Sequence, residues 1–251
     1  MKILILGHKG YLGSYLHQYI DSDVLIGRDV YDNGQQYDCI INCIGKVSLE
    51  YCESNPDQSY KSNVQVVKDI ITNYPNTKII NFSSYYVYND SGLCTESSKT
   101  TNKYIYNKHK LESERIVTEA SGLTFRIGKL FGSLAKSRFP KLTEYILNEN
   151  NITLDNVLFN PTSVSQVLKV INSCNQLTGV YNLSNSGTCT HYEYGMTINN
   201  LLGNTKNINK VNKIKRTFTN YGKFAMCTKK VSNYINLTPW EEDLKCIVSE
   251  I

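Results

Sequence analysis

The hydrophobic and polar positions of the chain alternate between short apolar runs and longer stretches with helical periodicity. The run at residues 2–6 ends in Gly7, which is typical of a buried parallel strand. After it, apolar side chains recur at helical spacing, at Leu12, Leu16, Tyr19 and Ile20. Residues 77–82 form another apolar run, and residues 107–120 carry an apolar stripe among charged positions. This alternation predicts an α/β fold built on a parallel sheet.

Three glycines, Gly7, Gly10 and Gly13, lie where the first predicted strand turns into the first predicted helix. Glycine can adopt a positive φ there and lets the backbone approach a pyrophosphate closely. The helix N-terminus adds N–H groups and a partial positive charge. The spacing G-x-x-G-x-x-G differs from the G-x-G-x-x-G of many dehydrogenases. We therefore predict a Rossmann-like, doubly wound sheet with a dinucleotide site, whose loop residues are Gly7, Lys9, Gly10, Tyr11, Leu12 and Gly13.

The charges after the second predicted strand, residues 23–26, bear on the cofactor. NAD sites usually place a carboxylate on the ribose 2′-hydroxyl at this strand end, whereas an arginine accommodates the 2′-phosphate of NADP. Arg28 is the first charged residue after the strand, and Lys9 in the glycine loop is a second cation. A shift of one residue would point Asp29 inward instead. The pattern favours NADP(H) and leaves NAD as the alternative.

A tyrosine and a lysine four residues apart, Tyr106 and Lys110, share one face of the helix predicted over residues 107–120. A nearby ammonium favours the phenolate, so we expect the pKa of Tyr106 to fall from about 10 towards neutrality. Such a phenol can act as the general acid for a carbonyl that is being reduced. Tyr104 and Lys108 have the same spacing and form an alternative pair.

The run at residues 77–82 ends in hydroxyl-bearing residues, Ser83 and Ser84, which would face the ligand crevice at the carboxyl end of a parallel strand. Here the chain resembles the extended short-chain dehydrogenase/reductases. In that superfamily the catalytic Ser or Thr stands three residues before the Val or Ile of a V-Y/F pair, so Val87-Tyr88 points to Ser84.

The tyrosine motif of the same superfamily favours one of the two tyrosine–lysine pairs. It commonly places a Glu four residues after the Lys, and Tyr106, Lys110 and Glu114 match that order. Lys110-Leu111 also resembles the K-L-x-x-E of sugar-nucleotide reductases. The pair of Tyr104 and Lys108 loses the leucine and ranks second.

The closer resemblance is to the dTDP-4-dehydrorhamnose reductase family, and it covers nearly the whole chain. The matching segments, in chain order, are residues 41–45, 53–63, 159–162, 179–187 and 239–240. The glycine loop is also similar to that of GDP-fucose synthase, in which a cation binds NADP, and this supports the same role for Lys9. The resemblance implies an NADPH-dependent reductase acting on the keto carbon, most simply C4, of a nucleotide-linked 6-deoxysugar.

The resemblance also implies roles for individual residues. Tyr106 would protonate the developing alkoxide, Lys110 would hold the nicotinamide ribose, and Ser84 would hydrogen-bond the carbonyl oxygen. The further cofactor contacts expected are Arg28, Cys43, Ile44, Gly45 and Asn63. The substrate contacts expected, some from position alone, are Ser84, Tyr85, Arg138, Phe139 and Lys215.

The positions after Ser84 argue against two related activities. Sugar-nucleotide 4,6-dehydratases need an Asp/Glu pair there, whereas this chain has Tyr85 and Tyr86. Bifunctional epimerase-reductases use a Cys two residues after the Ser, and that position is again Tyr86. A C4 epimerase that holds NAD tightly needs only the Ser-Tyr-Lys set, so it stays open. A non-catalytic NADP-binding regulatory subunit is the third alternative.

The composition argues against several classes of partner. The net charge is +5, and the one basic run, residues 206–216, lacks the interleaved aromatics of a nucleic-acid surface, so we expect a solvated face or a diphosphate clamp. Eight cysteines without C-x-x-C predict reduced thiols. Four histidines show no metal spacing, and no signal or membrane-spanning run is present. We expect a cytoplasmic protein without metal, membrane or nucleic-acid partners; a homodimer stays open.

The 251 residues suffice for one domain with a subdomain. We expect a cofactor domain over residues 1–132 and a smaller substrate-binding region over 133–251, of which about 156–184 returns to the sheet. Twelve residues separate Ile26 from Cys39, close to the minimum for a parallel crossover. The usual second helix and third strand must therefore be cut to a turn or a very short segment at one edge of the sheet.

Overall fold

The computed structural model describes residues 1–25, 34–89, 92–132, 140–214 and 224–249. The chain divides into two compact units. The first contains Met1–Asn89, Ser98–Arg126 and Asn175–Tyr181, and the second contains Asp90–Ser97, Ile127–Cys174 and Asn182–Ile251. The units interleave along the chain, whereas the division predicted from the sequence places the main boundary near residue 132 and returns only about 156–184 to the sheet.

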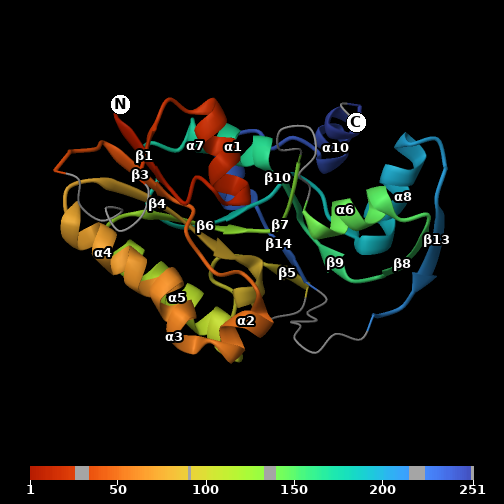
Figure 1. Ribbon diagram of the computed structural model, residues 1–251, viewed down its shortest axis with the longest axis horizontal. Coiled ribbons are helices and arrows are strands. Elements are labelled where there is room, and N and C mark those ends of the chain that lie inside the picture. The colour runs from red at the N-terminus through yellow and green to blue at the C-terminus, as the bar shows by residue number, and fades with distance from the viewer. Residues whose placement is uncertain (26–33, 90–91, 133–139, 215–223, 250–251) are drawn as a thin grey trace. The chain divides into compact units, whose positions relative to one another are not determined.

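A six-stranded sheet lies at the centre of the first unit, in the order β11-β6-β4-β3-β1-β2 (Figure 1). Its strands are β1 (Ile3–Leu6), β2 (Asp23–Val24), β3 (Cys39–Asn42), β4 (Lys78–Ser84), β6 (Leu123–Ile127) and β11 (Gly179–Leu183). β1 pairs in parallel with β2 and β3, and β3 pairs in parallel with β4. Leu4, Ile40 and Ile79 lie in register across three of these strands. The predicted α/β fold with a parallel sheet is confirmed.

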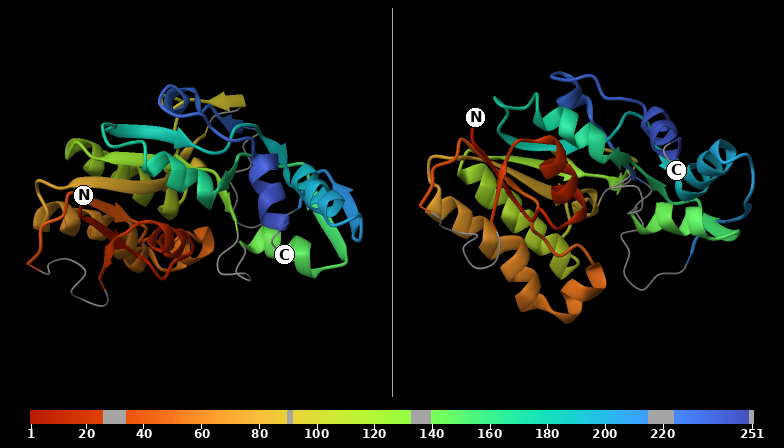
Figure 2. Two further views of the ribbon diagram at one scale, coloured as in Figure 1. Left: turned by 90° about the horizontal axis from the view of Figure 1, so that it is seen from above. Right: turned by 45° about the horizontal axis from the view of Figure 1, so that its top comes forward.

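Helices cover both faces of this sheet, so its strands are buried on both sides and read as continuous apolar runs. α1 (Tyr11–Tyr19) lies on one face, and α4 (Val66–Asn73) and α5 (Ile105–Glu119) lie side by side on the other (Figures 1 and 2). Shorter elements precede α4: α2 (Leu49–Ser54), α3 (Pro56–Tyr60) and the π-helix η2 (Lys61–Gln65). Leu4, Ile40, Ile70 and Val117 belong to the core between β1, β3, α4 and α5.

The edge of the sheet at β2 is short. The segment between Ile26 and Cys39, which the sequence predicts to be a turn or a very short element, lies largely outside the described residues. β2 has two residues, and among the described residues no strand pairs with its outer side. Asp38 ties the start of β3 to β1, because its carboxylate accepts the Lys2 N–H at 2.6 Å and its own N–H donates to Lys2 O at 2.9 Å. These two bonds fix the first residue before β3 against the start of β1.

The described residues of the second unit form four two-stranded pairings. They are β7 (Lys129–Phe131) with β10 (Pro161–Ser163), β8 (Asn151–Asp155) with β13 (Asn207–Val211), β9 (Leu158–Phe159) with β12 (Cys189–Thr190), and β5 (Gly92–Cys94) with β14 (Phe224–Met226). Its helices are α6 (Lys141–Asn148), α7 (Val164–Ile171), α8 (His191–Leu201), α9 (Lys229–Ser232) and α10 (Trp240–Val248). None of the described helices of either unit is both long and apolar enough to cross a membrane.

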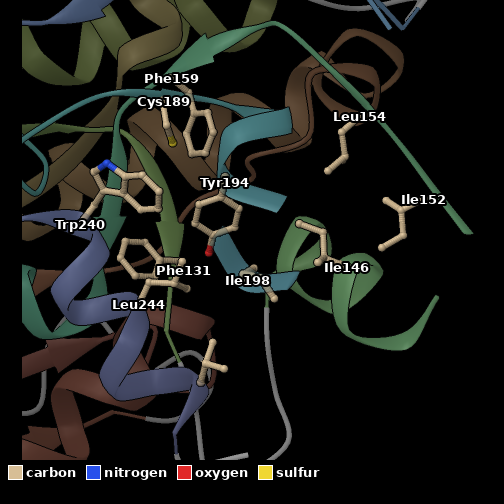
Figure 3. Packing of buried hydrophobic residues seen from close by; sticks show 11 residues of the cluster. Phe131, Ile146, Ile152, Leu154, Phe159, Cys189, Tyr194, Ile198, Trp240 and Leu244 are labelled. Carbon is tan, nitrogen blue, oxygen red and sulfur yellow. The ribbon is translucent and has the colours of Figure 1, made fainter. Parts of the chain in front are cut away.

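The core of the second unit is built around Tyr194 of α8 (Figure 3). Its ring centroid lies 6.0 Å from that of Phe131, 5.6 Å from Phe159 and 5.8 Å from Trp240. The hydroxyl of Tyr194 is 3.0 Å from Thr143 Oγ1, so the one polar atom of this buried ring is satisfied. Aromatic packing thus joins strands β7 and β9 to helices α8 and α10.

Candidate active site

The glycine turn after β1 has no room for a side chain at Gly7 or at Gly13. Gly7 has a φ of +81°, and the Gly10 N–H donates to Gly7 O at 2.8 Å. A Cβ on Gly13 would lie 2.3 Å from Gly7 O, and one on Gly7 would lie 2.8 Å from the carbonyl carbon of Cys43. The backbone of α1 therefore crosses directly over the end of β1, which only glycine permits.

The N-terminus of α1 can accept an anion. Gly10 is its N-cap and provides no side-chain cap, and the first turn contains no acidic residue. The partial positive charge of the helix end is therefore not offset within that turn. Lys9 is exposed beside it, Tyr11 is half-buried and Leu12 is buried. Arg28, the expected second cation, lies outside the described residues.

The end of β3 forms the neighbouring wall. The Cys43 N–H donates to Leu6 O at 2.9 Å, and the Ile44 N–H donates to Asn42 Oδ1 at 3.1 Å. These bonds hold residues 43–45 against the glycine turn. Burial raises the pKa of the Cys43 thiol to about 12, so this side chain is a neutral lining group at physiological pH.

Gly45, Asn63 and Lys110 come together in a small cradle. Asn63, on the π-helix η2, donates to Lys46 O at 3.1 Å and accepts the Lys46 N–H at 3.1 Å. A Cβ on Gly45 would lie 2.9 Å from Asn63 Oδ1 and 3.3 Å from Lys110 Nζ. The space beside the two polar groups therefore stays open only because residue 45 is glycine.

Ser84, Tyr106 and Lys110 form one buried cluster, with 7%, 4% and 6% of their surfaces exposed. Lys110 Nζ lies 5.9 Å from the centroid of the Tyr106 ring and donates to Phe82 O at 2.9 Å. Ser84 Oγ accepts the Tyr86 N–H at 3.2 Å, which leaves the Ser84 O–H to donate elsewhere.

The alternative pair does not join this cluster. Lys108 is exposed, and Tyr104 is the half-buried N-cap of α5, with its ring 5.0 Å from Lys103 Nζ. The side of α5 that faces β4 carries Tyr106 and Lys110 instead. The structure therefore brings to Ser84 the tyrosine–lysine pair that the family motif ranked first.

The pKa of Tyr106 differs from the one that the sequence predicts. Burial raises the pKa of Tyr106 above its ordinary value, and a hydrogen bond with Ser84 offsets this only in part. The predicted fall of the Tyr106 pKa towards neutrality is therefore wrong for this structure, because desolvation outweighs the neighbouring ammonium. Burial lowers the pKa of Lys110 to about 8, against the raising effect of Glu114. At neutral pH the cluster thus combines a neutral phenol with an ammonium.

The expected substrate contacts are only partly described. Tyr85 is half-buried, and its ring centroid is 4.6 Å from that of Tyr86. Arg138, Phe139 and Lys215 lie outside the described residues. In the basic run, Lys206 Nζ donates to Leu147 O at 2.5 Å, so this lysine is bonded to the last turn of α6 within the second unit. Among the residues that the structure describes, no group of His, Cys, Asp or Glu could hold a metal ion.

Comparison with known proteins supplies the family. The family model described as the RmlD substrate binding domain matches residues 1–251. This chain belongs to the RmlD substrate binding domain family. A comparison with curated protein sequences finds no significant match.

Solved structures share the fold of this RmlD-family chain. A dTDP-4-dehydrorhamnose reductase from Clostridium acetobutylicum is 20% identical with a TM-score of 0.85, and the match covers 99% of each chain. The same enzyme from Bacillus anthracis, in complex with NADP, is 18% identical with a TM-score of 0.84 and equal coverage. A UDP-Glc/GlcNAc 4-epimerase from Campylobacter jejuni is 16% identical with a TM-score of 0.77, covering 99% of this chain and 97% of its own. At these identities the likeness shows the fold.

Sequence reasoning missed the buried polar side chains that link β3, β4 and α5 of this RmlD-family chain. Asn42 donates to Asn81 Oδ1 at 2.9 Å, and Asn81 donates to Ser113 Oγ at 2.8 Å. Asn107 Nδ2 donates to Tyr86 O. The signal was present, because an asparagine inside an apolar strand must find a hydrogen-bond partner, but the sequence does not say which one.

Proposed function

We propose that this chain is an NADPH-dependent ketoreductase that reduces the keto group, at C4, of a nucleotide-linked 4-keto-6-deoxysugar in deoxysugar biosynthesis. The observation that carries the proposal is the buried cluster of a neutral phenol, a hydroxyl and an ammonium at the carboxyl end of β4. Ligands of open α/β sheets bind at this end of the strands. The family match and the reductases among the similar structures support the substrate class.

The described residues fit a dinucleotide. The uncapped start of α1 and the glycine turn suit its pyrophosphate, and exposed Lys9 suits a 2′-phosphate. The cradle of Gly45, Asn63 and Lys110 suits the nicotinamide ribose, because Lys110 Nζ and Asn63 Oδ1 border a space that a Cβ would fill. NADPH bound there supplies a hydride to the keto carbon.

The three clustered side chains would complete the reduction by handling the oxygen. The Ser84 O–H donates to the carbonyl oxygen, which fixes the carbonyl and stabilises the negative charge that develops on it. The Tyr106 phenol then gives its proton to that oxygen, so that the C=O becomes CH–OH. Lys110 offsets the charge of the transient phenolate until solvent restores the proton. Hydride and proton together balance the reduction.

The reaction should lose rate in alkaline solution as Lys110 deprotonates. Because burial lowers its pKa to about 8, Lys110 is charged below that pH and neutral above it. We expect kcat/KM to be level near pH 7 and to fall about tenfold per unit well above pH 8. A pH–rate profile of wild type and Lys110→Arg checks this, since arginine does not titrate in that range. A wild-type profile that stays level to about pH 10 would contradict the assignment.

Adding one methyl group to the cradle should weaken cofactor binding. In Gly45→Ala the new Cβ would meet Asn63 Oδ1 at 2.9 Å, which forces movement in the wall of the site. Overpacking of about 1–3 kcal/mol corresponds to a roughly 5- to 150-fold rise in the Kd for NADPH. Calorimetric titration measures it, with Val47→Ala, on an exposed residue of the same loop, as the control. Equal affinities of Gly45→Ala and wild type for NADPH would show that the cradle of Gly45, Asn63 and Lys110 does not contact the cofactor.

A C4 epimerase is the second candidate, favoured by the similar fold of the Campylobacter jejuni 4-epimerase. It would use the same Ser84, Tyr106 and Lys110 but return the hydride to the sugar. The absorbance of NADPH, followed with a panel of nucleotide-linked 4-keto-6-deoxysugars, separates the two. Stoichiometric oxidation supports the reductase. A parallel incubation of a nucleotide-linked 4-hydroxysugar with the oxidised cofactor tests the other reaction. Interconversion of its C4 epimers would identify an epimerase, and tight NADPH binding without either reaction would indicate a regulatory subunit.

A further inference from the structure

A buried ion pair joins α5 to β6 behind the Ser84–Tyr106–Lys110 cluster. Glu114 and Arg126 are each 6% exposed. The Arg126 Nη2 donates to Glu114 Oε2 at 2.7 Å, and Nε lies 3.0 Å from Oε1 and 3.2 Å from Oε2. Buried ion pairs often add little to stability compared with apolar residues of similar volume, so their presence is better explained by what they position.

Both ends of the segment that carries Ser84 are attached to this pair. Before it, the Ser83 hydroxyl donates to Glu114 Oε1. After it, Tyr88 Oη accepts from Arg126 Nη1 at 3.0 Å, and the Tyr88 ring lies 4.9 Å from the guanidinium carbon. The short helix η3 (Tyr85–Val87) that follows Ser84 is thus held from both sides.

Glu114 also acts on Lys110, one turn earlier on α5. The groups that face Lys110 are Tyr106 and Glu114 from α5, Cys52 from α2 (Leu49–Ser54) and Cys43 after β3. Burial raises the pKa values of both thiols, so they are neutral near pH 7. Glu114 is therefore the carboxylate, among these described groups, that favours the ammonium form of Lys110.

We propose that Glu114, fixed by Arg126 and Ser83, is a positioning residue that aligns Ser84 with Tyr106 and Lys110 and compensates the charge of Lys110. The proposal rests on the proposed function for its catalytic consequence. Glu114 is not itself a catalytic residue, because its oxygens are engaged by Arg126 and Ser83 inside the first unit.

The charge of Lys110 can be measured without any turnover. In protein labelled with carbon-13 at the lysine side chains, the Lys110 signal, identified by its loss in Lys110→Met, should titrate near pH 8. In Glu114→Gln its midpoint should fall by about one pH unit, because a neighbouring opposite charge is lost and Arg126 is left unpaired. The matched control is Glu119→Gln, on the same helix in the exposed pair Arg115–Glu119, which should leave the midpoint unchanged.

Steady-state kinetics test whether Glu114 aligns Ser84 with Tyr106 and Lys110. If wild type reduces its substrate, Glu114→Gln should lower kcat by about 10²-fold with KM changed less, as a small misplacement of reacting groups does. A wild type without turnover would contradict the proposed function, while the titration would still decide the role of Glu114. Should Glu114→Gln not fold, Glu114→Gln/Arg126→Met removes both charges together and should show a smaller fall in midpoint, because the carboxylate is lost but no unpaired guanidinium remains. A folded variant with the wild-type midpoint and wild-type kcat would overturn the proposal.

Discussion

Tyr106→Phe should lower kcat by about 10³-fold, within the range that general acids contribute, while binding NADPH as wild type does. The phenol is buried, its pKa is raised, and it lies beside Ser84, so it is a protonated donor throughout the neutral range. Phenylalanine keeps the ring that packs near Lys110 and removes only the O–H. Steady-state rates and a calorimetric Kd for the same preparation measure the two effects.

The matched control for that variant is Tyr104→Phe. Tyr104 is the half-buried N-cap of α5, makes no side-chain cap there and lies outside the Ser84–Tyr106–Lys110 cluster. We expect Tyr104→Phe to stay within about twofold of wild type, well below a general-acid effect. A large loss in Tyr104→Phe together with an active Tyr106→Phe would transfer the catalytic role to the other pair.

Gly13→Ala should destabilise the first unit and abolish measurable NADPH binding. Its Cβ would lie 2.3 Å from Gly7 O, a backbone atom that cannot rotate away. Relief requires α1 to move off the end of β1, which costs about 3 kcal/mol, at the upper end of overpacking effects. Chemical unfolding measures the free energy of unfolding, and fluorescence titration measures the binding.

Gly10→Ala is the graded control for this turn. Gly10 has an ordinary φ of −75°, and its added Cβ would meet Gly7 O at 3.2 Å, a contact that a small shift relieves. We expect it to lose less than about 1 kcal/mol of unfolding free energy. Equal losses for Gly10→Ala and Gly13→Ala would show that the close crossing of α1 over Gly7 does not set the stability of the turn.

The central strands β1, β3 and β4 were predictable because they are buried and appear as short, mostly apolar runs. The turn after Leu6 was predictable for a related reason, since close backbone approach leaves glycine as the sole solution at Gly7 and Gly13. These features depend on the local sequence, either on its apolar runs or on the glycines that a close backbone approach requires. The shortened crossover expected between Ile26 and Cys39 stays a prediction, since residues 26–33 lie outside the described part of the chain.

Features that depend on tertiary contacts were not predictable. β5 pairs with β14 across more than a hundred residues, so residues 90–97 fall in the second unit, which no local pattern signals. The pKa of Tyr106 was predicted in the wrong direction because the sequence shows the neighbouring lysine but not the depth of burial. The family motif identified Glu114 by its spacing from Lys110. Its partner Arg126 could not be identified in this way, because it lies on β6 and meets Glu114 only in the fold.

Transfer of a deuterium label from NADPH to the sugar tests the proposed reduction. The chain is incubated with NADPH that carries deuterium at the transferred position and a nucleotide-linked 4-keto-6-deoxysugar, and the product is examined by mass spectrometry and NMR. We expect one deuterium at C4 of the sugar for each NADPH oxidised, and loss of the transfer in Tyr106→Phe. Unlabelled product, or a label at C4 that survives in Tyr106→Phe at the wild-type rate, would contradict this expectation.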